Sequence, residues 1–259
     1  MTTLREAYDA SAIAWGGGPD RVYGTLAEAL LVRGPRWAGL HVVDIGAGTG
    51  TATRRLSAAG AQVVAVDVAV EMLAVARARC ACTVVAGDAC ALPLRDGAAG
   101  AAVLGFVLNH LSRPAAALRE AARVVRPGGW VLASTWSRDD GHPVREIVQQ
   151  ALLDRGWRVP EWYQAVKEAT TPLSDTAAAL GRLARSAGLA EVDTSEVAIR
   201  VPVTAGDLLG WRLGMPHTAP FVDALPPAEQ RRLWQELQDA AASLPPLVCT
   251  MSVLVSRVF

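Results

Sequence analysis

Short apolar runs alternate with longer amphipathic segments along the first half of the chain. The predicted strands, rich in valine and alanine, are residues 41–46, 62–67, 83–88, 100–106 and 129–136. The predicted helices between them are residues 50–59, 69–80 and 114–126. Alternating strands and helices are typical of a parallel, doubly wound sheet with helices on both faces. We therefore expect an α/β fold.

The pattern after residue 136 is less regular, and prolines interrupt it repeatedly. The predicted elements there are helices near 143–155, 174–187, 204–214 and 226–242, an apolar aromatic segment at 157–168, and strands at 191–201 and 247–258. Proline ends helices and is excluded from central strands. The second half is therefore expected to combine a lid of short helices with two further strands.

The first predicted strand ends in a glycine-rich turn, DIGAGTG at residues 44–50. Glycines in such a turn let backbone amides approach a ligand before a helix begins at Thr51. Ligands of open α/β sheets bind at this carboxyl edge. Glycine spacing alone is a weak signal, because nucleotide-binding loops and ordinary tight strand-to-helix turns share it.

An acidic residue stands at the end of each of the first three predicted strands: Asp44, Asp67 and Asp88. Asp67 follows the turn by about 20 residues, where a ribose-binding acid belongs in such folds. A single aspartate after a strand is more often a helix N-cap or a solvated turn residue. Three in register favour one ligand site at this edge of the sheet.

Five motifs together resemble those of class I S-adenosylmethionine-dependent methyltransferases, in the ubiquinone and menaquinone biosynthesis-like branch (methyltransferase type 11). They are the turn at 44–50, Asp67 with Met72, GDA at 87–89 with Leu92 and Pro93, FVLNHL at 106–111, and LRE at 118–120 through RPGG at 126–129. The resemblance implies a Rossmann-like, mostly parallel seven-stranded sheet with an antiparallel last strand and helical lid insertions. It also implies an enzyme that uses S-adenosylmethionine as cofactor.

The resemblance divides the single domain expected over residues 1–259 into three parts. Residues 1–39 would cap the cofactor, 40–136 would bind it, and 137–259 would form the substrate lid and complete the sheet. One domain suffices, because a chain of 259 residues with 51% hydrophobic residues can bury one sizeable core.

By the same resemblance, the polar end of the cofactor would lie along the first two strand ends. Gly46, Ala47 and Gly48 would follow the methionine moiety, with Asp44 nearby. Asp67 would accept hydrogen bonds from both ribose hydroxyls.

The adenine would lie beyond the third strand. Asp88 would accept a hydrogen bond from the adenine amine, and the Ala89 amide would meet a ring nitrogen. The remaining predicted cofactor contacts are Val68, Met72, Leu92 and Phe106.

The segment before the first strand carries three aromatic residues, Tyr8, Trp15 and Tyr23. As a cap, these rings would shield the cofactor sulfonium, a contact worth about 0.5–2 kcal/mol, and Arg21 would pair with the cofactor carboxylate. An amphipathic helix that packs Tyr8, Ile13 and Trp15 against the sheet is equally consistent with the spacing. The sequence leaves both alternatives open.

Methyl transfer needs alignment and, for a hydroxyl acceptor, a base. His110 is the first candidate, because it follows the fourth predicted strand and some relatives use a histidine there. It competes with a purely structural role as a loop cap. His217 and His142, on predicted substrate-facing loops, are the next candidates. Residues 134–136 are Ser-Thr-Trp where some relatives have an acid, which places a His–Asp pair in doubt.

The acceptor is expected to be a small apolar or aromatic molecule, since aromatic residues gather in the second half of the chain. The pocket candidates are Trp136, Trp157, Trp162, Tyr163, Trp211, Met215 and Phe221, whereas Trp234 is expected in the core. Natural-product biosynthesis in bacteria is the expected setting. The alternative is a cyclase or pericyclase that keeps the cofactor without transferring its methyl group.

Charge and cysteine content narrow the class further. The formal net charge is zero, so the basic surface of a nucleic-acid-binding protein is not expected. The four cysteines lack zinc spacing and are expected to be reduced, with no metal bound. No apolar run is long enough to span a bilayer, so we expect a cytoplasmic protein with no membrane partner. A homodimer stays open.

Overall fold

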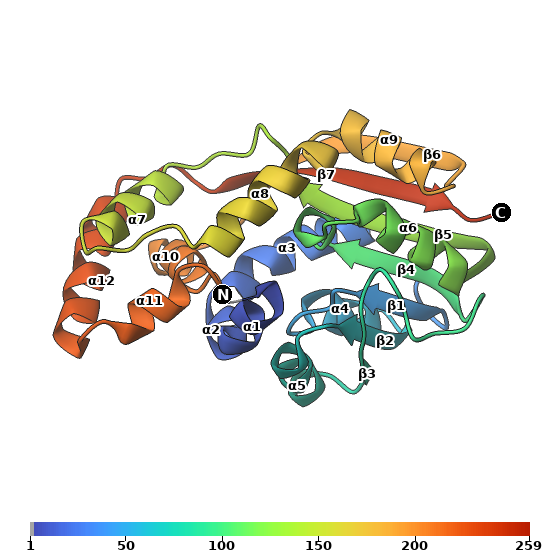
Figure 1. The fold of residues 1–259 in the computed structure, drawn as a ribbon, viewed down its shortest axis with the longest axis horizontal. Coiled ribbons are helices and arrows are strands. Elements are labelled where there is room, and N and C mark those ends of the chain that lie inside the picture. Colours follow the sequence, from blue (N-terminus) through green and yellow to red (C-terminus); the bar gives the residue numbers. More distant parts are fainter. Residues whose placement is uncertain (1–2) are drawn as a thin grey trace.

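One seven-stranded sheet forms the centre of the computed structural model, which describes residues 3–259 (Figure 1). The strands are β1 (His41–Ile45), β2 (Gln62–Asp67), β3 (Thr83–Ala86), β4 (Ala99–Gly105), β5 (Val125–Trp136), β6 (Glu191–Arg200) and β7 (Val248–Arg257). Their spatial order is β3-β2-β1-β4-β5-β7-β6, and β7 alone runs antiparallel to its neighbours. The predicted sheet with its antiparallel last strand is confirmed.

Continuous apolar sequence explains the central strands. Six of the seven residues of β4 are buried, as expected for a parallel strand covered by helices on both faces. β3 ends at Ala86, two residues earlier than predicted, and Asp88 lies in the following turn, bridged to Ala91.

Twelve α-helices and a short 3-10 turn are assigned within residues 3–259. They are α1 (Leu4–Ala10), α2 (Ala12–Gly17), α3 (Pro19–Leu31), α4 (Thr51–Ala58), α5 (Val70–Arg79), η1 (Leu108–His110), α6 (Pro114–Val124), α7 (Val144–Leu153), α8 (Glu161–Ser174), α9 (Ala177–Ser186), α10 (Ala205–Leu213), α11 (Ala219–Ala224) and α12 (Pro227–Ala241). The aromatic segment at 157–168 becomes the start of α8, and the short α11 was not predicted. None of these helices is long and apolar enough to cross a membrane.

Trp234 corrects one expectation about the core. Its side chain is 37% exposed, whereas Leu233, Leu237 and Ala241 on the same helix are buried. These three residues recur at a spacing of four and form the buried stripe of α12. Trp234 is one position away, about 100° around the helix, and therefore faces outward.

The helical half of the chain gathers beyond the carboxyl ends of the parallel strands. Figure 1 shows α7, α10, α11 and α12 at one end of the molecule, with α8 alongside and the N-terminal helices α1 to α3 between them and the sheet. α3 packs against α4 and also against α10. The N-terminal segment therefore joins the helix after the glycine-rich turn to α10.

A glycine contact holds the N-terminal segment against α10. A Cβ on Gly18 would lie 2.1 Å from the carbonyl oxygen of Gly210, a backbone atom that has no side-chain freedom to move away. Around Gly17 a Cβ would meet nothing within 4 Å. Close packing against α10 therefore requires a glycine at residue 18 but not at residue 17.

We expect Gly18→Ala to lower the free energy of unfolding by about 1–3 kcal/mol, the usual cost of overpacking, and the melting temperature by several degrees. Gly17→Ala serves as the matched control. It should leave the melting temperature unchanged or raise it slightly, because alanine restricts the unfolded chain. Thermal unfolding followed by circular dichroism measures both. Equal melting temperatures for the two variants would contradict the contact.

Candidate active site

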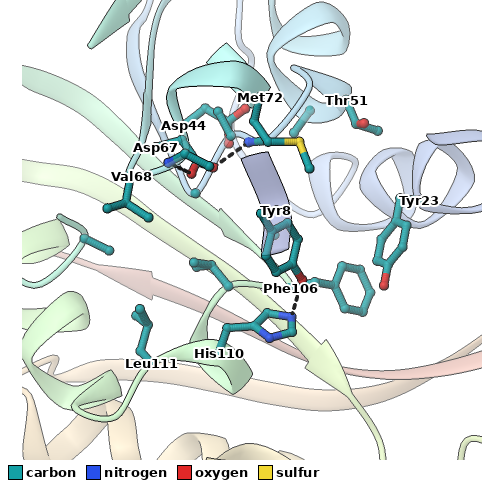
Figure 2. Close-up of a pocket in the computed structure, with 18 of the residues that line it drawn as sticks. Tyr8, Tyr23, Asp44, Thr51, Asp67, Val68, Met72, Phe106, His110 and Leu111 are labelled. Carbon is teal, nitrogen blue, oxygen red and sulfur yellow. Dashed lines mark hydrogen bonds between the residues drawn. The ribbon is translucent and has the colours of Figure 1, made fainter. Parts of the chain in front are cut away.

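A cavity of about 390 Å³ opens at the carboxyl ends of β1, β2 and β4, beneath the N-terminal helices. This volume lies within the range of small-molecule sites. Its wall includes the glycine-rich turn, all three strand-end aspartates and the segment from Gly105 to Leu111 (Figure 2). The residues that the sequence placed at one sheet edge therefore share one cavity.

The glycine-rich turn requires its glycines for conformation. Gly46, Gly48 and Gly50 have φ angles of 70°, 55° and 82°, in the left-handed region that side chains disfavour. At Gly46 a Cβ would also lie 2.5 Å from a methyl of Val107. Gly46, Ala47 and Gly48 all line the cavity, as the sequence predicted.

Asp67 is held in place by backbone amides. Its carboxylate accepts hydrogen bonds from the N–H groups of Gly48 at 2.8 Å and Ala69 at 2.9 Å (Figure 2). Burial raises the pKa of Asp67 in spite of these bonds. Each carboxylate oxygen has a second lone pair, so Asp67 can accept further hydrogen bonds from a ligand.

Asp44 is the most deeply buried acid of the cavity wall, with only 2% of its surface exposed. The Thr53 hydroxyl donates to it at 2.6 Å. Burial raises the pKa of Asp44 to about 6, and the charge of Asp67 adds to the rise. Within residues 3–259 no lysine, arginine or histidine forms an ion pair with either acid. A buried and a partly buried acid without a cation favour a positively charged ligand.

The third aspartate lies at the rim of the cavity. Asp88 is exposed, and one of its oxygens accepts from the Cys90 N–H at 2.8 Å, which closes a local turn. Ala89 is buried beside it. Val68 and Met72 also line the cavity, with Val68 partly exposed and Met72 buried. Their roles toward a cofactor stay predictions.

Leu92, expected beside the adenine, lies elsewhere. It is buried in the core cluster that contains Val66 and Ala89, and its N–H donates to Glu120 at 2.7 Å. It is not part of the cavity wall. The motif at 92–93 thus anchors the segment after β3 to α6.

Phe106 adopts an unusual backbone conformation at the end of β4. It is the one non-glycine residue with positive φ, 57°, in the part of the chain that the structure describes. Such residues cost of order 1–3 kcal/mol and cluster at functional sites. The centroid of its ring lies 5.2 Å from that of Tyr23 and 4.8 Å from that of Trp136. Phe106 also lines the cavity.

The aromatic residues of the N-terminal segment also line the cavity. The Tyr8 and Trp15 rings are 5.6 Å apart, and Trp15 stacks on Tyr23 at 5.1 Å. Ile13 is 88% exposed, so the alternative in which it packs with Tyr8 and Trp15 against the sheet is wrong.

Arg21, predicted to pair with the cofactor carboxylate, does not line the cavity, so that prediction is wrong. On α3 the neighbouring Val22 and Tyr23 are buried, which turns the Arg21 side chain outward, where it is 68% exposed and pairs with Asp207 of α10 at 3.2 Å. Arg5 lines the cavity instead. It lies three residues before Tyr8, on the same face of α1. This helical spacing was the signal in the sequence that could have identified Arg5.

Thr51 is a second cavity residue to which the sequence analysis assigned no role in the site. It begins α4 directly after Gly50, and its hydroxyl donates to Asp20 on α3. Asp20 also pairs with Arg54 at 2.6 Å. These contacts tie the N-terminal segment to the helix that follows the glycine-rich turn.

His110 is the only predicted catalytic histidine in the cavity wall. Its Nε2 lies 3.2 Å from the Tyr8 hydroxyl and 3.3 Å from the Asn109 amide nitrogen (Figure 2). Burial lowers the pKa of His110 to about 4, with a further contribution from the charge of Lys167. The imidazole is therefore neutral at pH 7 and able to accept a proton.

The other two histidines lie outside this cavity. Nε2 of His142 donates to the Pro245 carbonyl at 3.0 Å, and its Nδ1 accepts from the Val144 N–H at 3.3 Å. Both nitrogens are engaged, so His142 has a structural role and the prediction of a base is corrected. His217 stacks on Tyr163 at 3.9 Å on the lid side.

Residues 43–133 match the family model described as a methyltransferase domain. Demethylmenaquinone methyltransferase of Mycobacterium tuberculosis is 33% identical over 109 residues, which are 39% of this chain and 47% of the relative. The chain thus spans less than half the length of the curated relatives that it matches.

Solved structures share the fold over a larger part of the chain. Phosphoethanolamine N-methyltransferase 2 of Haemonchus contortus, in complex with phosphomonomethylethanolamine and S-adenosylhomocysteine, superposes with a TM-score of 0.62 and 17% identity, over 100% of this chain and 61% of that one. The [4+2]-cyclase SpnF gives a TM-score of 0.58 and 22% identity, over 91% and 81%. At these identities the likeness concerns the fold alone.

Proposed function

We propose that this chain, whose residues 43–133 match a methyltransferase domain, is a class I S-adenosylmethionine-dependent methyltransferase that transfers the cofactor's methyl group to a small, largely apolar molecule. One observation supports the proposal above the others. Asp44 is buried and Asp67 is partly buried in the same cavity wall, and neither has a cationic partner within residues 3–259. A sulfonium cofactor that carries an ammonium group and a ribose diol suits this pair of acids.

The residues of the cavity fit such a cofactor. Asp67 would accept from the ribose hydroxyls, the glycine-rich turn would approach the methionine moiety, and Asp88 would accept from the adenine amine. When bound, the cofactor supplies an electrophilic methyl group. The aromatic rings of Tyr8 and Trp15, which also line the cavity, would exclude water from that group and favour its positive charge.

His110 would serve as the base for a hydroxyl acceptor. Its neutral imidazole can take the released proton at Nε2, beside the Tyr8 hydroxyl that orients the ring. Tyr8 itself stays protonated, because burial raises its pKa well above its ordinary value. His110 would thus hold the proton, and Tyr8 would position the His110 ring.

The acceptor would enter from the lid side, where Trp136 and Trp211 stack at 5.9 Å. Trp136 also contacts the ring of Phe106 in the cavity wall. A flat apolar molecule suits these surfaces. We place the reaction in bacterial natural-product biosynthesis and in the cytoplasm.

A cyclase or pericyclase is the second candidate. Its support is the fold shared with the [4+2]-cyclase SpnF over 91% of this chain, together with the absence of an acid at residues 134–136 that would pair with His110. Such an enzyme would bind the same cofactor and leave its methyl group in place.

One experiment separates the two candidates. The chain is incubated with methyl-labelled S-adenosylmethionine and a bacterial metabolite extract, and products are searched for a labelled mass increase of one methyl group. Label in a small molecule supports methyl transfer. Cofactor binding without label, together with consumption of an unmethylated metabolite, would favour the cyclase.

The pKa of Asp44 leads to a pH-dependent prediction for cofactor binding. A cationic ligand binds the ionised acid, and this acid is protonated below about pH 6. We expect the affinity for S-adenosylmethionine to fall by about tenfold between pH 7 and pH 5, since one bound proton must be released. Titration calorimetry at the two pH values measures this change.

Asp44→Asn is the matched variant for that experiment, because its amide oxygen can still accept from the Thr53 hydroxyl. We expect it to bind the cofactor weakly at both pH values, with a smaller pH dependence. Because the pKa of Asp44 is raised from 3.8 to about 6 in the folded protein, the protonated acid stabilises the fold. This contribution is complete below pH 3.8 and is lost as the pH rises through about 6. The variant should therefore be at least as stable as the parent at pH 7. An unchanged pH dependence would exclude Asp44 as the titrating group.

A further inference from the structure

Three cationic side chains lie near enough to influence one another's charge: Arg145 of α7, Arg212 of α10 and the exposed Lys167 of α8. We call them the cation cluster. The guanidinium groups of Arg145 and Arg212 lie 5.7 Å and 5.2 Å from the ring of Trp211. In Figure 1, α7, α8 and α10 belong to the same end of the molecule as the N-terminal helices. Three helices far apart in sequence thus bring like charges together.

Few acidic side chains neutralise the positive charges of the cation cluster. Arg145 pairs with Asp140, whereas neither Arg212 nor Lys167 forms an ion pair within residues 3–259. Asp140 is itself occupied, because it also accepts from the Thr250 N–H at 2.7 Å. Like charges without counter-charges repel one another, and a site of this kind favours an anion.

Unused hydrogen-bond donors in the same place support the electrostatic argument. Nε of Arg145, Nε of Arg212 and Nε1 of Trp211 are buried and have no hydrogen-bond partner among the described residues. Buried donors are nearly always satisfied in folded proteins, and the exceptions call for an explanation. All three are hydrogen-bond donors, so the unpaired groups here favour a ligand that only accepts hydrogen bonds.

The Arg212 side chain is enclosed by protein without being fully buried. Burial lowers the pKa of Arg212 to about 10, with the charge of Arg145 adding to the shift. Part of the side chain remains accessible, so a ligand can reach it.

The cation cluster adjoins the proposed reaction centre. The charge of Lys167 lowers the pKa of both His110 and His217. On the other side, stacked rings lead from Phe106 in the cavity wall through Trp136 to Trp211. A molecule bound at the cluster can therefore extend its apolar part toward His110.

We propose that the cation cluster binds a carboxylate of the acceptor, so that the acceptor is an aromatic or otherwise apolar carboxylic acid. The inference rests on the proposed function, because it treats the bound acid as the molecule that is modified. A planar carboxylate matches the fork of a guanidinium, and aromatic surroundings suit the rest of the molecule. The reaction that supplies this acceptor must leave its acid group free.

Binding of three matched probes to the whole chain tests the proposal without any turnover. The probes are 2-naphthoate, its neutral amide 2-naphthamide, and 2-naphthyl phosphate, titrated up to millimolar concentration and followed by calorimetry. We expect the carboxylate to bind at least about tenfold more tightly than the amide, as for a charge-assisted hydrogen bond. The difference should shrink at high salt.

Arg212→Met removes the charge and keeps the length of the side chain. We expect it to lower the carboxylate preference to less than about threefold, with Arg212→Lys partly restoring it. Arg182→Met, at an exposed arginine of α9, is the matched control and should keep the full preference. Arg212→Met should melt no earlier than the parent, since it removes an unpaired charge. A lower melting temperature would indicate a structural role.

Several outcomes would overturn the proposal. They are equal affinities for the acid and the amide, no binding of the carboxylate at millimolar concentration, and an unchanged preference in Arg212→Met. Tighter binding of the phosphate than of the carboxylate would replace the carboxylic acid with a phosphorylated acceptor. Failure of methyl transfer alone is a separate result, because the acid–amide comparison does not depend on it.

Discussion

Asp67→Ala should weaken the binding of S-adenosylmethionine by at least about a hundredfold. The substitution removes the charged acceptor proposed for both ribose hydroxyls, and charge-assisted hydrogen bonds contribute about 1.5–3 kcal/mol each. It also deprives the Gly48 and Ala69 amides of their present acceptor, which loosens the turn. Titration calorimetry at pH 7 measures the affinity.

Two further variants separate loss of the ribose contact from loss of the turn. Asp67→Asn keeps a carbonyl oxygen for one amide and should bind more tightly than Asp67→Ala, although less tightly than the parent. Glu71→Ala, at an exposed acid on α5, should bind normally. An affinity in Asp67→Ala equal to that of the parent would refute our position for the ribose.

His110→Ala should reduce the turnover number for a hydroxyl acceptor by about 10²–10⁴-fold, the usual contribution of a general base. The cofactor affinity should change little, because His110 contacts Tyr8 and Asn109 rather than the three aspartates. His41→Ala, at an exposed histidine that begins β1, is the matched control and should remain fully active.

The pH profile gives this prediction a second measurement. With the pKa of His110 lowered to about 4, its neutral form predominates at every pH above 5. At saturating cofactor, the turnover number should therefore stay level between pH 6 and pH 8. An unchanged turnover number in His110→Ala would remove its role as base.

The sequence predicted the strands well, because parallel strands covered on both faces are continuous apolar runs. β1, β2 and β4 differ from the predicted ranges by no more than one residue at either end. α11 was not foreseen, since a helix of six residues between prolines has too few turns to produce a periodic pattern.

The candidate site was predicted where residues follow strands directly. The three aspartates and His110 line the cavity, because the carboxyl ends of parallel strands meet at one edge. Arg21 and His142 were misplaced, since the direction of a side chain on a helix or loop depends on tertiary packing. The cation cluster was missed altogether: its members come from three helices separated by dozens of residues, and no local pattern joins them.

The place of β7 between β5 and β6 has a consequence for how the chain acquires its shape. β6 pairs with β7 alone, although some fifty residues separate them in the sequence. During synthesis, residues 191–200 emerge long before the segment that fills their backbone hydrogen bonds. During that interval the ten residues of this strand have unpaired backbone groups and could pair with another chain. The charged side chains of Glu191, Asp193, Glu196 and Arg200 oppose such pairing.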